Sequence, residues 1–225
     1  MKTAFSPVGL LITLLALVAG AAFAVFLPEA RDAASAHDGE LAALFAITLL
    51  LQSCSVRVSA RGSISTSSLG VLAAAFMLGA GAAMVIAAAA AAVQWIRRRG
   101  LPHRAIFDAA NFSLSAGVAA TVFEVLAGHG EVRASEIVAA TLAGAAYCAT
   151  NTGLLCCAMG LSEGTSPAAI WRERFQWAMP HYLAAGPIAF AAVLGYQGVG
   201  VFGIAIIGGA YAASLVGHRR FALAA

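Results

Sequence analysis

Apolar residues run along the chain in long blocks separated by short polar and charged stretches. A membrane-spanning helix needs about 20 consecutive apolar residues, and most of these blocks approach that length. The predicted helical segments lie at about 7–27, 40–56, 63–78, 82–96, 104–127, 136–160, 177–196 and 199–217. We therefore expect an all-α, polytopic membrane protein with six to eight membrane segments, in which residues 1–225 form a single integral membrane domain.

The stretch from Gly62 to Ile96 carries no charged residue and is too long for one comfortable pass. It opens with a serine-rich run at 63–68, and Gly79 and Gly81 lie near its middle. Glycine interrupts helices. We expect a short helix pair at 63–96, forming either two thin passes or a re-entrant hairpin. Both arrangements return the chain to its starting side.

The composition supports the membrane assignment. The chain is 61% hydrophobic and only 10% charged, whereas about 25% of the residues in a soluble domain are charged. The expected partner of its surface is the lipid bilayer, and the net charge of +3 is typical of basic loops rather than of nucleic acid binding. The four cysteines lie in or beside apolar blocks, and we expect them to be small core residues.

The basic residues are distributed asymmetrically between the two sides. If the N-terminus is inside and the helix pair leaves and returns to the same side, eleven of the thirteen Lys and Arg residues fall on one side. They are Lys2, Arg57, Arg61, Arg97, Arg98, Arg99, Arg104, Arg172, Arg174, Arg219 and Arg220. Arg31 and Arg133 remain on the other side, within acidic loops, and the first of these loops contains Glu29. Positive residues favour the cytoplasm, so we expect both termini to be cytoplasmic, in the cytoplasmic membrane of a bacterium.

The segment 104–127 carries three polar residues on one helical face, Asp108, Asn111 and Ser115. Polar groups at membrane depth are costly and often functional, so this face is a candidate ligand-binding stripe. Asp108 also lies one turn from Arg104, and an ion pair at the start of the helix is the structural alternative.

Two further residues complete the candidate ligand site, Asn151 in segment 136–160 and His181 in segment 177–196. An unpaired amide in an apolar environment is costly, so Asn151 is expected to hydrogen-bond across helices, with Asn111 as one partner. His181 is either a proton or ligand site or a structural hydrogen bonder. We expect these residues to line a closed polar cavity.

No motif for catalysis, a cofactor or a metal is present, so we expect neither an enzyme nor a cofactor.

Several segments resemble the N-terminal membrane region of bacterial signalling proteins that carry HD-GYP phosphodiesterase or diguanylate cyclase domains. They are SISTSSLGVLAAAFMLGAGAA (63–83), RRRGLPHRAIFDAANFSLSAGVAA (97–120), NTGLL (151–155) and LSEGTSPAAIWRER (161–174). The chain departs from that pattern at Asp108, where an amide would be expected. The resemblance implies a multi-pass sensor or anchor module. A second, architectural similarity is to the substrate-binding subunits of energy-coupling-factor vitamin transporters.

Three functions remain open at this point. The first is a non-enzymatic membrane module that binds or senses a small molecule or signals to a cytoplasmic partner protein. The second is a substrate-binding subunit of a small-molecule transporter, which works with an energising partner. The third is a structural subunit of a larger membrane complex, packed through alanine and glycine faces.

Overall fold

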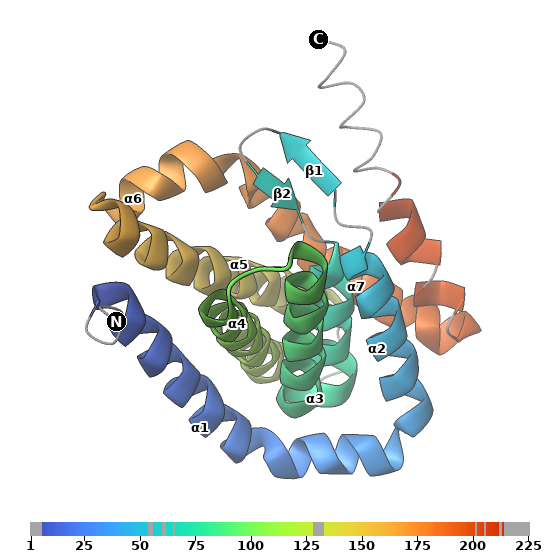
Figure 1. Ribbon diagram of the computed structural model, residues 1–225. Helices are drawn as coiled ribbons and strands as arrows, with labels where there is room; N and C mark the ends of the chain where they lie inside the picture. The colour runs from blue at the N-terminus through green and yellow to red at the C-terminus, as the bar shows by residue number, and fades with distance from the viewer. Residues whose placement is uncertain are drawn as a thin grey trace.

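The computed structural model describes residues 6–53, 56–59, 62–64, 66–127, 133–200, 202–204, 206–211 and 213. Its helices are α1 (Pro7–Ala36), α2 (Asp38–Ser53), α3 (Ser67–Arg98), α4 (Pro102–Ala127), α5 (Arg133–Glu163), α6 (Pro167–Ile170) and α7 (Met179–Val199). A π-helical turn, Trp171–Phe175, and a 3-10 turn, Gln176–Ala178, join α6 to α7. Among the described residues, α1, α3, α4, α5 and α7 are long and apolar enough to cross a membrane. The all-α polytopic fold class is therefore confirmed (Figure 1).

A small antiparallel pair of strands, β1 (Val56–Ser59) and β2 (Gly62–Ile64), lies between α2 and α3. It corrects the predicted helix ends, since the segment 40–56 stops at Ser53 and the segment 63–78 begins only at Ser67. The alternating Val-Arg-Val-Ser sequence of β1 suits extended backbone, because β-branched residues favour strands.

Helix α3 folds back on itself at Gly79, whose φ of 80° and ψ of −173° are not helical. The Ser67 hydroxyl donates to Gln52 Oε1 at 2.6 Å, and Gln52 Nε2 donates to Gln94 Oε1 at 2.8 Å. A straight helix would separate residues 67 and 94 by about 40 Å, so one glutamine on α2 can reach both only if the two halves lie side by side (Figure 1). The predicted break and return of this segment are thus present, with the break at Gly79.

Helix α1 is longer than predicted, because it continues through the expected acidic loop to Ala36. Pro28 lies inside the helix, and the residues after it, including Glu29 and Arg31, are good helix formers. The segment 199–217 is only partly described: residues 202–204, 206–211 and 213 are helical, and the rest lie outside the described residues, as do Lys2, Arg61, Arg219 and Arg220.

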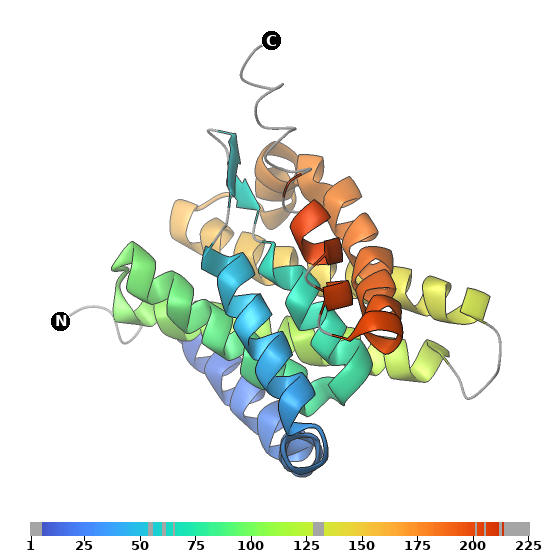
Figure 2. The same cartoon turned by 90° about the vertical axis from the view of Figure 1, so that its right-hand side faces the viewer.

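Helix α3 is central, in contact with α1, α2, α4 and α7, while α5 packs against α4 and α7. Figure 2 shows the same bundle from the side. Small residues allow close approach, as at Gly186, where an added Cβ would collide with the Ala140 carbonyl group of α5.

Cys148 and Cys156 are buried, but Cys157 is exposed. Neighbouring helical residues point in different directions, so the expectation of a core position was wrong for Cys157; Cys54 lies outside the described residues.

Candidate functional site

The predicted amide residues meet at the packed face between α4 and α5. Asn111 is 2% exposed, and its Nδ2 donates to the backbone carbonyl oxygen of Asn151 at 3.2 Å. Ser115 is fully buried and donates to the Asn111 carbonyl oxygen one turn back, at 2.7 Å. Within the described part of the chain, Asn111 Oδ1 is buried without a hydrogen-bond partner. The expected link between Asn111 and Asn151 therefore exists, but through the backbone of Asn151, and it leaves one acceptor open.

A groove beside α4 is apolar, unlike the polar cavity that the sequence predicts. It is a groove of about 390 Å³ between α1, α3 and α4, and its walls are almost entirely apolar. Asn111 is not among its lining residues. Ser113 is, but its hydroxyl group donates to the Met84 carbonyl oxygen of α3 at 3.1 Å.

His181 is in contact with two tyrosines, Tyr182 and Tyr211. Its ring stacks on Tyr211, with centroids 5.1 Å apart, and the Tyr211 hydroxyl group lies 2.7 and 2.8 Å from the two ring nitrogens. The Tyr182 ring meets it edge-on. These contacts fit the structural alternative for His181, a hydrogen bonder that joins α7 to the helical residues after it.

Asp108 belongs to a chain of polar side chains across α2, α3 and α4. Its Oδ2 accepts from Gln94 Nε2 at 3.3 Å, Gln94 accepts from Gln52, and Gln52 accepts from Ser67. We call Gln52, Ser67, Gln94 and Asp108 the amide clasp. The hydrogen bond to Asp108 thus comes from Gln94 rather than from Arg104.

Basic residues surround the amide clasp. The Arg97 guanidinium group donates to the carbonyl oxygens of Gln52 and Ser53, which satisfies acceptors left open at the end of α2. The Trp95 indole donates to the Gly100 carbonyl oxygen at 2.8 Å. The end of α2 and both ends of the α3 hairpin therefore meet at one basic end of the bundle.

The opposite end of the hairpin is held by Glu29. Its Oε1 accepts from the backbone N–H of Ala80 at 2.9 Å, and its Oε2 accepts from that of Gly81 at 3.2 Å. A carboxylate at the start of a helix satisfies free N–H groups and meets the positive end of the helix dipole. Glu29, which the sequence placed in a loop, is therefore the N-terminal cap of the second half of α3.

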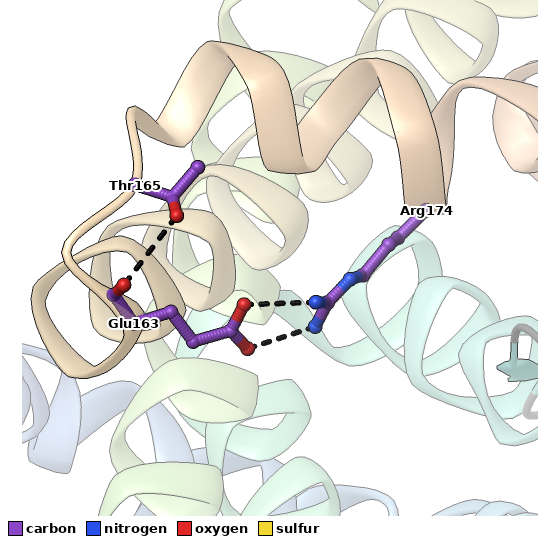
Figure 3. Close-up of polar contacts among 3 residues, drawn as sticks. All are labelled: Glu163, Thr165 and Arg174. Atoms are coloured by element: carbon purple, nitrogen blue, oxygen red, sulfur yellow. Dashed lines mark hydrogen bonds and ion pairs between the residues drawn. The ribbon is translucent and has the colours of Figure 1, made fainter.

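A third polar element closes the corner between α5 and α6 (Figure 3). Arg174 donates twice to Glu163, at 2.9 and 2.8 Å, and the Thr165 hydroxyl donates to the Glu163 carbonyl oxygen at 3.5 Å. Gly164 has a φ of 68°, which glycine adopts without strain. Ser166 caps the helix that begins at Pro167, and its side chain accepts a hydrogen bond from the Ala169 N–H. The segment 161–174 is therefore a defined corner.

The roles of Gln52 and Gln94 and the capping role of Glu29 were not predicted from the sequence. Gln52 and Gln94 did give a signal, because an amide within an apolar segment needs a partner. Glu29 gave none, since its partner is a helix break more than fifty residues away in the sequence. In the described ranges, no three His, Cys, Asp or Glu side chains are grouped so as to hold a metal ion.

Comparison with curated proteins finds no match. The model of the MASE9 family, a family of membrane-associated sensory domains, matches residues 40–219. The match covers all of the amide clasp and most of the chain, and α1 with Glu29 precedes it. The expected membrane sensory class is thereby supported. The chain belongs to the MASE9 family of membrane-associated sensory domains.

Proposed function

We propose that this chain is a non-enzymatic sensory module that detects a signal within the membrane and passes it to a cytoplasmic partner through the α3 hairpin. Membership of MASE9 supports a sensory role over solute capture or a purely structural role. By the sequence resemblance, the partner is a signalling domain of the HD-GYP phosphodiesterase or diguanylate cyclase type. The basic end of the bundle, with Arg97 and Arg104, faces the cytoplasm in this proposal.

The amide clasp is the observation that carries the proposal. It joins both halves of α3 to α2 and α4 through side-chain hydrogen bonds, and a bond between neutral groups makes a net contribution of about 1 kcal/mol. Contacts of that size hold one arrangement of a hinged helix pair without making the alternative inaccessible. Gly79 is the proposed hinge, because glycine changes φ and ψ at a lower steric cost than other residues.

Asn111 is the proposed point of ligand contact. Its buried, open Oδ1 would accept a hydrogen bond from an N–H or O–H group of a small molecule, which removes a penalty of about 1–3 kcal/mol. Asn111 lies one turn from Asp108 on α4. A ligand that shifts this turn would act directly on the amide clasp.

A chimera tests signal transfer. A diguanylate cyclase domain is fused after residue 225, and cyclic di-GMP is measured in cells at matched expression. Gln52→Leu removes the centre of the amide clasp, so we expect cyclic di-GMP to change about fivefold, which corresponds to about one hydrogen bond.

Gln176→Leu is the matched control, because it makes the same change at an exposed glutamine and should leave cyclic di-GMP unchanged. Equal cyclic di-GMP from the Gln52→Leu chimera and the unmodified one, with both inserted in the membrane, would refute signal transfer through the hairpin.

A further inference from the structure

The groove between α1, α3 and α4 has the shape and chemistry of an acyl-chain site. Small residues of α1 and α4, among them Gly20 and Ala109, form its walls. Its one polar lining residue, Ser113, already donates its hydroxyl proton within the protein. Val85 and Ile106 border it and are 39% and 51% exposed, so the groove opens sideways, where lipid surrounds the bundle.

Basic and aromatic residues continue the groove toward the basic end. On α3, Trp95 lies seven residues beyond Ala88, which returns it to the groove face of a helix with 3.6 residues per turn, and Arg99 follows as the C-cap that ends the helix. On α4, His103 lies one turn before Ile106. An apolar groove thus ends beside an interfacial indole and two groups suited to a phosphate.

Arg99 is an exposed cation at the C-terminal cap of α3. Its φ is 46°, in the left-handed region that glycine adopts more easily, although the next residue is Gly100. Its side chain is exposed, and within the described part of the chain no hydrogen bond or ion pair engages it. The nearest acid on α4, Asp108, is bonded to Gln94, and Glu163 at the α5 corner is paired with Arg174.

We propose that the groove binds an acyl chain of an anionic phospholipid from the adjoining leaflet, with the lipid phosphate held by Arg99 and His103. The lipid would pack α1 onto α3 and α4. This site is separate from Asn111 and from the amide clasp, so it stands or falls independently of signal transfer.

Native mass spectrometry of the full purified chain tests the proposal, with phosphatidylglycerol and phosphatidylcholine of identical acyl chains as probes. The chain should retain one phosphatidylglycerol in preference to phosphatidylcholine. Gly20→Leu fills the groove, and because a Cβ at Gly20 meets nothing within 4 Å, the variant should fold but lose the lipid. Gly153→Leu, at a glycine of α5 that is equally open, should keep it.

Arg99→Gly tests the headgroup contact without straining the backbone, since glycine suits the positive φ. It should lower the preference for phosphatidylglycerol about fivefold, as expected for one cation near a phosphate, while the melting temperature stays equal or rises. Arg172→Gln removes an exposed charge elsewhere and should not change the preference. Equal retention of both lipids by the unmodified chain, retention of an apolar non-lipid molecule instead, or full retention by Gly20→Leu would overturn the proposal.

Discussion

Both ends of the Gln52 amide are occupied: its oxygen accepts from Ser67 and its nitrogen donates to Gln94. A single side chain therefore links two positions that lie far apart along α3. The Glu29 carboxylate does the corresponding work at Gly79–Gly81, where it covers the N–H groups exposed by the helix break. Between them, these two residues hold both ends of the hairpin.

Removal of the Glu29 carboxylate should destabilise the hairpin. Glu29→Ala leaves the N–H groups of Ala80 and Gly81 without their acceptors, so we expect a loss of about 0.5–2 kcal/mol, as for other helix caps. Thermal unfolding in detergent measures the effect. Asp32→Ala, three residues further along α1 at an exposed acid, is the control. Equal stability of the two variants would show that Glu29 is not a cap.

Loss of the Gln52 amide should also lower stability. Gln52→Leu removes the hydrogen bonds that Gln52 makes with the buried Ser67 and the half-buried Gln94, at a cost of about 1–3 kcal/mol. The same unfolding measurement, with Gln176→Leu as the control, checks this. A Gln52→Leu variant that unfolds at the temperature of the unmodified chain would argue against the amide clasp.

At the scale of elements, the α3 hairpin depends on close backbone contact with α1. Gly79 provides the turn between the two halves of α3, and Gly81 lies directly against the backbone of Phe26 and Ala30. The two halves differ in length, at about 18 Å for residues 67–78 and about 29 Å for residues 80–98. Because Gly81 is in contact with Phe26 and Ala30, the tip of the hairpin packs on α1 near Pro28.

Gly81→Ala should separate the hairpin tip from α1. The added methyl group would overlap backbone atoms of Phe26 and Ala30, and overpacking of this kind costs about 1–3 kcal/mol. Gly153→Ala, which has open space around it, should be neutral or stabilise by about 0.5–1 kcal/mol. Unfolding of both variants in the same detergent gives the comparison. Similar shifts in the two would show that the contact is loose.

The sequence was informative about elements and less so about their partners. The break at Gly79 was predictable because glycines interrupt an uncharged run that is too long for one helix. Helix 104–127 was close to the observed α4, since charged and polar stretches bound the apolar block on both sides. The extension of α1 past Pro28 was missed because proline usually ends a helix and a charged stretch after an apolar block was interpreted as a loop, whereas contact with α3 favours a helix. For the ligand stripe, the spacing placed Asn111 and Ser115 together on α4, but Asp108 found its partner on α3.

At the scale of the whole molecule, the hairpin determines where the charges lie. Because α3 returns to its starting end, Arg97 and Arg104 share that end with the last residues of α2. Glu29 and the connection between α1 and α2 lie at the opposite end (Figure 1). Positive residues favour the cytoplasm, so an output partner is expected at the basic end.

The central claim is that α3 is a hairpin whose two ends share one face of the membrane. Single cysteines at Ser63 and at Ile96, in a chain whose four native cysteines are replaced, are treated with a membrane-impermeant maleimide in vesicles of each orientation. We predict that both are labelled from the cytoplasmic face, while a cysteine at Asp32 is labelled only from the other face. Labelling of Ser63 and Ile96 from opposite faces would contradict the hairpin and make α3 a single straight pass.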